Sequence, residues 1–470
     1  MAQDIQALAN APVGRLLWRY SLPSVVGMLV MALYNVVDRI FIGQVVGPEA
    51  IAGLTLTFPL MNITTAFGVL VGVGASSRAS IALGRQDVPG ANAILGNAFV
   101  LTLINALIYS ACFIGWIDPI LRLFGAGDVT LPYAREYMLW VLPGLVMTNL
   151  AFSFNNLMRA SGFPRKAMFT MLIGAAVNIV LDAVFVLGFG WGMTGAALAT
   201  DIAMFVSAAF VMQHFLVKRH ILHFTRGTFR LRAPIIMAII SIGAAPSVIN
   251  AASCLINALI NNALVDHGGD MAIGAAGIFV TYTSLIITTA LGICMGLQPI
   301  VGYNYGAGRY DRLRRAFWLA TACGTALCTF GTVFGMSLPG TIARTFTADD
   351  YLIGVTVNCL RLCLWAFWMV GIQIMATALF QSIGDAPRSI FLSLTRQVIF
   401  LVPLLLILPA RWGVDGVWLA FPVSDVLATV VTGIMVWRLF RHRLPRLARQ
   451  RSEGQVAAHE ETEVPCPSVE

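Results

Sequence analysis

Residues 91–115, ANAILGNAFVLTLINALIYSACFIG, carry no charged side chain over 25 positions. A helix needs about 20 mostly apolar residues to cross the hydrocarbon core of a bilayer. Backbone groups in hydrocarbon must be paired within their own segment, and the run lacks the alternation of a barrel strand, so it predicts a transmembrane helix. Comparable runs lie near residues 16–42, 51–75, 133–157, 166–189, 194–217, 235–264, 273–300, 314–337, 353–381, 389–409 and 415–440. The sequence therefore predicts an all-α membrane protein with twelve transmembrane helices.

The composition of the whole chain agrees with this interpretation. Of its 470 residues 58% are apolar and 11% are charged, against about 25% charged in an ordinary soluble domain. The formal charge is +8, but the basic residues are scattered singly, which disfavours a nucleic-acid-binding face. The eight cysteines form no Cys-x-x-Cys pair, so we expect neither a disulfide framework nor a structural metal site. No cleavable signal peptide is indicated before Arg15, and we expect the first apolar run to remain as an anchor.

Basic residues are distributed unequally between the two sets of connections. The termini and the even-numbered connections hold 23 of the 30 Lys and Arg residues, among them Arg159, whereas the odd-numbered connections hold Arg122, Arg135, Arg344 and Arg411. Lys and Arg near the ends of spans are retained on the cytoplasmic side. We therefore predict that both termini and the central linker are cytoplasmic.

The two halves of the sequence repeat each other at a nearly constant offset. Four short motifs recur in the same order: residues 23–25 at 246–248, 84–87 at 308–311, 164–165 at 387–388 and 191–195 at 412–416. Because six is an even number of spans, the repeats are parallel, and we expect two six-helix lobes around a central cavity. The predicted organisation is an N-terminus of residues 1–15, an N-lobe of 16–217, a linker of 218–234, a C-lobe of 235–440 and a disordered tail of 441–470.

Four aspartates fall well inside predicted spans: Asp38, Asp182, Asp201 and Asp425. A carboxylate at the bilayer centre costs about 2.5 to 3.5 kcal/mol on insertion scales, so such a group usually faces a cavity or a partner. Tyr34 precedes Asp38 by four residues and Asn178 precedes Asp182 by four, so each pair shares a helix face.

Asn155, Asn156 and Thr200 lie in nearby spans. Carboxylate, amide and hydroxyl oxygens suit a proton relay or a hard cation such as Na⁺. We therefore predict a coupling site for a proton, or for Na⁺ at Asp38 and Asp182. Alternatives remain for single acids: Asp38 could pair with an arginine or lie at the interface beside Arg39, and Asp201 could face the packing side. For Asp425 we expect a structural ion pair with Arg396.

The sequence contains no phosphate-binding loop, no histidine in the middle of a span and no nucleophile paired with a base. We therefore expect a transporter driven by an ion gradient, with no cofactor, and not an enzyme. Aromatic faces attract organic cations and thioethers adapt to irregular shapes. On that basis the candidate substrate cavity includes Met31, Phe152 and Met204 in the first half and Tyr282 and Gln373 in the second. Ordinary helix packing explains each of these residues equally well.

The chain resembles the multidrug and toxic compound extrusion (MATE) family, and its DinF-like and MepA-like members in particular. The resemblance covers about residues 15–440 and rests on Pro23, residues 34–43, 178–182, 192–200 and 299–306. It implies cation-coupled antiport of amphiphilic, often cationic compounds out of the cell by a rocking exchange between the lobes. It also implies a bacterial cytoplasmic (inner) membrane location, a monomer and contact with membrane lipid.

The resemblance also carries site residues to this chain. The matching coupling positions are Tyr34, Asp38, Asn155, Asn178, Asp182 and Thr200, and Pro23 matches the proline at which the first helix bends. NorM-like relatives place acids in the seventh and tenth helices, where this chain has amides, so the first lobe becomes the preferred coupling site. A rival interpretation is a lipid-linked precursor flippase of the same superfamily, which would need a basic cavity built around Arg39 and Arg361.

Overall fold

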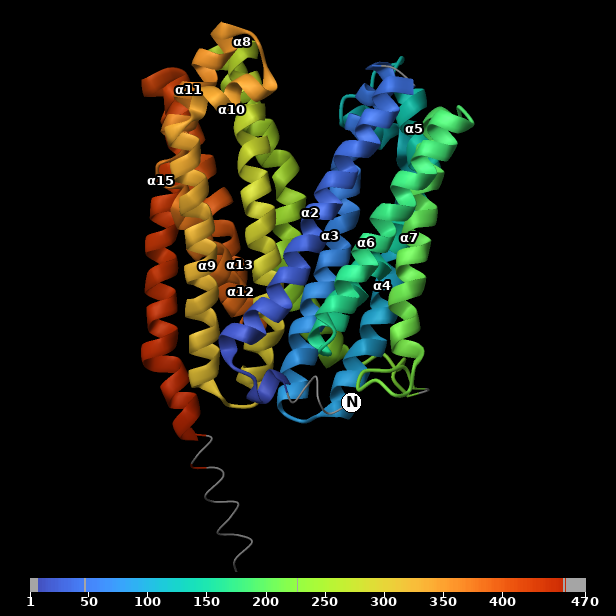
Figure 1. Cartoon of the computed structure of the whole chain (residues 1–470), viewed down its shortest axis with the longest axis vertical. Coiled ribbons are helices and arrows are strands. Elements are labelled where there is room, and N and C mark those ends of the chain that lie inside the picture. The colour runs from blue at the N-terminus through green and yellow to red at the C-terminus, as the bar shows by residue number, and fades with distance from the viewer. Residues whose placement is uncertain (1–6, 46–47, 226, 451–452, 454–470) are drawn as a thin grey trace, which may run out of the picture.

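The computed structural model describes residues 7–45, 48–225, 227–450 and 453. The side chains of residues 35, 38–45, 48–56, 58, 254 and 255 also lie outside the described part. The described chain is almost entirely helical (Figure 1). Its elements are α2 (Val13–Val45), α3 (Pro48–Gly84), α4 (Val88–Leu123), α5 (Leu131–Ala160), α6 (Pro164–Asp182), η1 (Ala183–Gly188), α7 (Gly192–Leu216), α8 (Ala233–Gly306), α9 (Tyr310–Ser337), α10 (Pro339–Phe346), α11 (Asp350–Leu364), η2 (Phe367–Met369), α12 (Val370–Ser382), α13 (Ala386–Leu394), η3 (Thr395–Leu401), α14 (Val402–Ile407), α15 (Pro409–Arg438) and η4 (Leu439–Arg443).

Ten helical stretches of the described residues are long and apolar enough to cross a membrane, and the bent pair α11 and η2–α12 brings the number to eleven. The two members of that pair meet at 48°. The 74-residue helix α8 is too long for one crossing, because about 20 residues suffice. With α8 counted as two crossings, the described helices account for the twelve that the sequence predicts.

Contacts with α3 show that α8 folds back on itself. A Cβ added to Gly74 would lie 2.1 Å from the carbonyl oxygen of Ile239, and one added to Gly84 would lie 2.1 Å from that of Tyr303. Ten residues of α3 span about 15 Å, whereas a straight helix from Ile239 to Tyr303 would span about 96 Å. The reversal falls at Gly269, whose φ of +65° is left-handed.

The two sequence repeats adopt matching backbone conformations at their turns. The second helix of each repeat is followed by a left-handed residue, Gln86 (φ +63°) in the first and Gly308 (φ +74°) in the second. The fourth helix is followed by Gly162 (φ +103°) and Gly384 (φ +79°). Glycine tolerates this region at low cost. The duplication seen in the sequence is therefore also present in the geometry of the loops.

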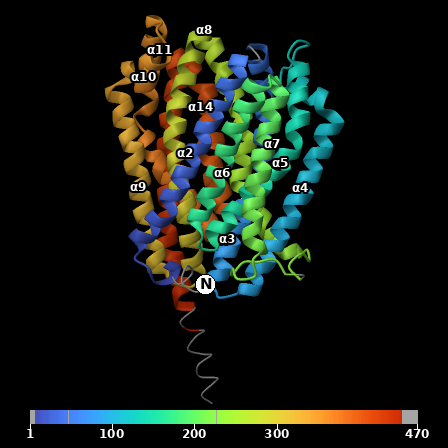
Figure 2. The same cartoon turned by 45° about the vertical axis from the view of Figure 1, so that its right-hand side comes forward.

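The helices form two groups, the N-lobe (α2–α7) and the C-lobe (α8–α15). In Figure 1 and Figure 2 the N-lobe is coloured from blue to green and the C-lobe from yellow to red. Figure 1 shows that the two lobes lie close together at the end where α7 ends and α9 begins, and that they diverge toward the opposite end. The buried core follows the same pattern. One large cluster joins both lobes and includes Val71, Ile239 and Val301, whereas two smaller clusters around Tyr137 and Trp418 belong to single lobes.

Glycines bring the backbones of the two lobes into direct contact. We call this contact the lobe seam; it comprises Gly74 and Gly84 of α3 with Gly243, Gly302 and Gly306 of α8. A Cβ added to Gly243 would lie 1.8 Å from the Leu70 carbonyl oxygen, and one added to Gly306 would lie 2.1 Å from that of Ile81. Any side chain would force the helices apart at these positions.

The central linker packs against the N-lobe. Asn97 of α4 donates to the Arg230 carbonyl (3.0 Å) and accepts from the Arg232 backbone N–H (2.8 Å). Asn92 accepts from the His223 backbone N–H at 2.9 Å. Two buried amides of one helix therefore fix the path of the chain between the lobes.

The prediction of disorder from residue 441 onward is wrong for its first ten residues, because the last helical stretch continues to Gln450. Leu444 is buried in the core that joins the lobes, and Arg443 forms an ion pair with Asp385. Packing and charge therefore continue the helix beyond the membrane span. The tail from residue 454 onward lies outside the described residues.

We expect Gly84→Ala to destabilise the protein by about 1 to 3 kcal/mol, because the added methyl group meets backbone atoms that cannot rotate away. Gly277→Ala in α8 is the matched control, since nothing lies within 4 Å of its added Cβ. Thermal unfolding in detergent measures both variants. Equal unfolding temperatures for Gly84→Ala and the unmodified protein would contradict the account of the lobe seam.

Candidate functional site

A small cavity lies in the N-lobe, among α2, α5, α6 and α7. Its volume is about 60 Å³, and its lining mixes thioethers, rings, hydroxyls, one amide and one guanidinium: Met31, Tyr34, Thr148, Ala151, Phe152, Asn155, Arg159, Thr170, Met171, Gly174, Ala175, Met204 and Ser207. The predicted cavity residues Met31, Phe152 and Met204 are among them. Drug-sized ligands need about 300 to 1,000 Å³, so in this conformation the space suits an ion or a few waters.

The structure brings the predicted residues Asn178 and Thr200 together across α6 and α7. The Asn178 amide donates to Thr200 Oγ1 at 3.3 Å, and Asn178 is 1% exposed. The side-chain oxygen of Asn178 is buried and accepts no hydrogen bond from the described residues. A buried amide oxygen without a donor needs a physical explanation, such as a bound ion or water.

Asp182 lies one turn beyond Asn178 on the same face of α6, and it is fully buried. It is the last residue of α6, and the π-helical turn η1 follows it. π-helical turns inside α-helices often mark functional positions, because the extra residue changes the direction of the side chains. Asn178, Asp182 and Thr200 therefore form a compact polar group inside the apolar N-lobe.

Asp38 and Tyr34 complete the predicted coupling set on α2. Tyr34 lines the N-lobe space, and its role in ion coupling stays a prediction. The side chain of Asp38 lies outside the described residues, so its position relative to Asp182 is not part of this structure. The pairing of Asp38 with Asp182 stays a prediction.

Arg159 is a charged residue whose burial the sequence did not reveal. Its position near the end of a span suggested a cytoplasmic connection, but the structure buries it to 2% exposure in the last turn of α5. Its guanidinium donates to Asn155 Oδ1 at 2.5 Å and to Asn156 Oδ1 at 2.8 Å. No carboxylate of the described residues lies within 4 Å of it. The i, i+4 spacing of Asn155 and Arg159 was the available signal.

This contact changes the interpretation of Asn155, which was predicted to help bind the coupling cation. Its oxygen accepts from Arg159, and its amide donates to the Ala167 carbonyl at 2.7 Å. The positive charge of the guanidinium repels a second cation at the same oxygen, so binding of Na⁺ at Asn155 would be favoured only if Arg159 moved away.

Asp201 faces the packing side of its helix, the alternative that the sequence left open. A Cβ added to Gly144 of α5 would lie 1.9 Å from Asp201 Oδ1, so the carboxylate fills the space above this glycine. Asp201 is 7% exposed and does not line the N-lobe space.

The predicted C-lobe residues take part in contacts between helices of that lobe. The Tyr282 hydroxyl of α8 donates to the Gly331 carbonyl of α9 at 2.6 Å. The Gln373 amide of α12 donates to the Asp425 carbonyl (2.8 Å) and to Thr429 Oγ1 (2.7 Å). Neither residue lines the N-lobe space, and a contact of either with substrate stays a prediction.

Arg396 and Asp425 lie together in the C-lobe, with Arg396 Nε 2.6 Å from Asp425 Oδ1. Arg396 lies in the π-helical segment η3, and Asp425 is buried in α15. A buried ionised carboxylate needs such a partner to offset its loss of hydration. Arg361, which the flippase interpretation would need, is exposed on α11, and the side chain of Arg39 lies outside the described residues.

Pro23 lies where α2 contacts the C-lobe. The residues on either side of it pack on α8: added Cβ atoms at Gly292 and Gly296 would lie 2.6 Å from the Cα atoms of Val25 and Ser21. α2 continues as a helix through Pro23, which removes one backbone hydrogen bond. The weakest point of the helix therefore coincides with its contact to the other lobe.

Comparison with known proteins places these residues in a family. The family model MatE matches residues 23–184 and 246–407. The two matches begin 223 residues apart, which is the offset of the repeated Pro23 and Pro246.

Individual relatives cover nearly the whole chain. A protein of Shewanella oneidensis described as a FAD transporter is 26% identical over 447 residues, which cover 93% of this chain and 97% of the relative. The multidrug export protein MepA of Staphylococcus aureus is 25% identical over 458 residues, covering 96% and 99%. The solved structure of the MATE multidrug transporter DinF-BH, a complex with a bound compound, is 36% identical, has a TM-score of 0.84 and covers 91% of this chain and 96% of that chain.

We expect Arg159→Met to lower the free energy of unfolding by about 2 to 3 kcal/mol, because two amide oxygens lose a charged donor. Arg165→Met is the matched control, since Arg165 is exposed at the start of α6. Denaturation of the purified protein compares the two variants. A loss of the same size in both would show that Arg159 has no special structural role.

Proposed function

Given that this chain belongs to the MatE family of multidrug efflux transporters, we propose that it is a cation-coupled antiporter that exports amphiphilic, often cationic organic compounds from the cytoplasm. The coupling ion is a proton or Na⁺. The observation that carries this proposal is the buried oxygen of Asn178, which has no donor among the described residues and lies one turn from the fully buried Asp182. Such oxygens favour a small cation or a transferable proton over a large ligand.

The coupling step follows from the cost of burying charge. Burial of an ionised Asp182 in the N-lobe is costly. The cost is offset when Na⁺ binds to the carboxylate or when the carboxylate takes up a proton, and either event changes the net charge of the polar group. α2 packs against α6, the helix that carries Asn178 and Asp182, because Gly27 of α2 lies against Met171 of α6. A change in charge there therefore alters how α2 packs, and α2 also contacts α8 beside Pro23.

The substrate requires more room than the N-lobe provides in this conformation. A space of about 60 Å³ cannot hold a drug-sized molecule. We infer that substrate enters when the lobes rearrange and that the lobe seam is the contact that opens in the alternate state. Support comes from the relatives: MepA is described as a multidrug export protein, and DinF-BH as a multidrug transporter solved with a compound bound.

Asp182→Asn and Asp38→Asn should each abolish export. An amide does not take up a proton at neutral pH, and it has no negative charge with which to bind Na⁺. The measurement is accumulation of a cationic rhodamine dye in inverted membrane vesicles, with pH and Na⁺ gradients imposed separately. Asp128→Asn is the matched control, since the side chain of Asp128 is 88% exposed in the loop before α5. Export at the unmodified rate in Asp182→Asn or Asp38→Asn would rule out the coupling assignment, and the gradient that supports accumulation identifies the ion.

A second candidate, export of an anionic compound, is favoured by Arg159. This buried guanidinium lines the N-lobe space and has no carboxylate of the described residues within 4 Å. Arginine binds phosphate and carboxylate groups through two parallel hydrogen bonds. The Shewanella oneidensis relative is described as a FAD transporter.

The two candidates differ in the expected effect of Arg159→Lys. If the substrate is anionic, vesicles should accumulate a flavin dinucleotide, and the variant should lose most of that activity because lysine cannot replace the bidentate geometry. If the substrate is cationic, export of the rhodamine dye should continue in Arg159→Lys and no flavin should accumulate. The same vesicle preparation serves both measurements.

A further inference from the structure

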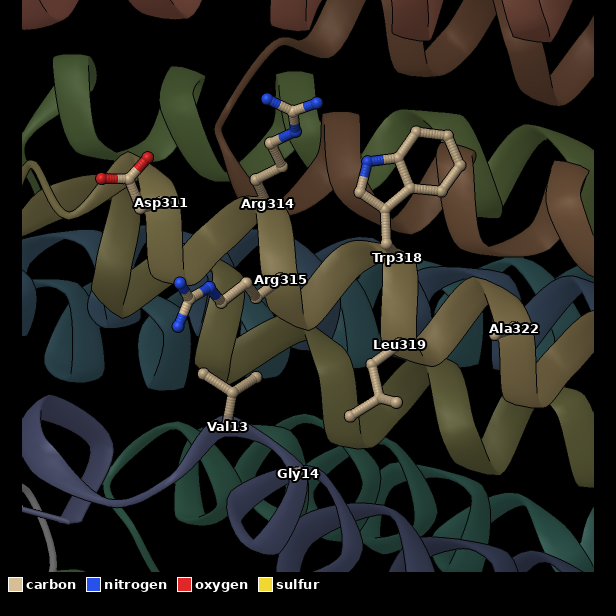
Figure 3. Close-up of a pocket in the computed structure, with 8 residues that line it drawn as sticks. All are labelled: Val13, Gly14, Asp311, Arg314, Arg315, Trp318, Leu319 and Ala322. Carbon is tan, nitrogen blue, oxygen red and sulfur yellow. The ribbon is translucent and has the colours of Figure 1, made fainter.

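Two hollows flank the beginning of α9 and share no lining residue with the N-lobe space. The first has a volume of about 740 Å³ and lies between α2 and α9 (Figure 3). Figure 3 shows Arg315 and Leu319 pointing toward Val13 of α2, while Arg314 and Trp318 extend from another side of α9. Both arginines lie within the first two turns of this helix, at its predicted cytoplasmic end.

The second hollow, of about 380 Å³, shares Arg314 and Trp318 with the first and extends to α15 and η4. The Arg314 guanidinium lies 5.9 Å from the centroid of the Phe440 ring, and Arg441 lies 5.5 Å from that of Trp437. The rings of Trp318 and Phe440 stack with centroids 6.2 Å apart. Arginines and aromatic rings therefore alternate along one continuous groove.

The arginines of this groove form no ion pair within the part of the chain that the structure describes. Among the described residues no carboxylate lies within 4 Å of Arg314, Arg315 or Arg441, although Asp311 lines the first hollow. Arg388 and Arg443 nearby are different, because both pair with Asp385. The groove thus keeps an excess of positive charge beside exposed apolar side chains. Trp318 is 50% exposed and Trp437 is 53% exposed.

We propose that this groove binds an anionic phospholipid of the cytoplasmic leaflet, with its phosphate on Arg314 and Arg441. Basic pockets between transmembrane helices on the cytoplasmic side suit anionic headgroups. Arginine favours phosphate because its donors match two oxygens at once. The apolar walls formed by Trp318, Leu319 and Trp437 would lie along the acyl chains, a feature that a free phosphate would not need.

A lipid bound in this groove would contact both the N-lobe and the C-lobe. Val13 belongs to the N-lobe helix α2, whereas the arginines belong to the C-lobe. Next to the groove, Arg312 of α9 already donates to the Ala11 carbonyl at 2.6 Å, and Arg309 donates to that of Ala9 at 2.5 Å. A lipid in the first hollow would therefore contact both lobes where they are joined.

Quenching of Trp318 by brominated lipids tests the proposal directly. The protein is reconstituted in vesicles containing either brominated phosphatidylglycerol or brominated phosphatidylcholine at equal mole fraction. The fluorescence of Trp318 is obtained as the difference between the fluorescence of the unmodified protein and that of Trp318→Phe. We expect stronger quenching by the anionic lipid, and a preference that falls about fivefold in Arg314→Gln, since each basic residue contributes about that factor.

Control variants separate a site from the general surface potential. Arg314→Lys keeps the charge but loses the bidentate geometry, so it should retain only part of the preference. Arg219→Gln removes one exposed charge from the linker on the same predicted face and should leave the preference unchanged. Equal quenching by both lipids, or an equal loss in Arg219→Gln, would overturn the proposal. Displacement of the lipid by inorganic phosphate would also overturn it, because the groove would then be a phosphate site. Transport activity does not enter this measurement, so its outcome is independent of the proposed function.

Discussion

The close contact between α3 and α8 is the constraint on which the rest of the structure depends. Gly74, Gly84, Gly243 and Gly306 let the backbones of the two lobes touch, and carbonyl oxygens occupy the space that a Cβ would need. The largest buried core lies around this contact and includes residues of both lobes, whereas the cores at the diverging end belong to single lobes. Backbone contact through glycine gives close packing without interlocking side chains, which suits the opening of the lobe seam that we propose.

Buried charge is handled differently in the two lobes. In the C-lobe Arg396 and Asp425 form an ion pair at 2.6 Å, and the charge of each offsets that of the other. In the N-lobe Arg159 is stabilised by the neutral oxygens of Asn155 and Asn156, and Asp182 is buried one turn from an amide oxygen that lacks a donor among the described residues. Within the described residues, the buried Arg396 and Asp425 of the C-lobe are therefore paired with each other, whereas buried polar groups of the N-lobe retain capacity for an ion. This asymmetry is the physical basis for assigning the coupling role to the N-lobe.

Much of the candidate site was predicted from the spacing of polar residues along single helices. Where this reasoning was incomplete, the physical cause can be identified. The i, i+4 spacing of Asn178 and Asp182 placed both on one face of α6, and the structure brings Asn178 to Thr200 of α7. The same reasoning did not reveal that Arg159 turns inward, because a basic residue near a span end usually faces the cytoplasm. Asn155 was predicted as a cation ligand, yet its oxygen accepts from Arg159. The tail was expected to be disordered from residue 441, whereas Leu444 packs in the core and the helix continues to Gln450.

The sequence alone determined the all-helical membrane class, the spans and the duplication, because hydrophobic length and repeated motifs are local properties of the chain. It also singled out Asp182, since an acid in an apolar run is conspicuous without any coordinates. Only the tertiary structure decided where the lobes touch, which oxygens face Arg159 and that Asp201 fills the space over Gly144. These features depend on contacts between helices far apart in the chain, and hydrophobicity does not specify the rotation of one helix against another.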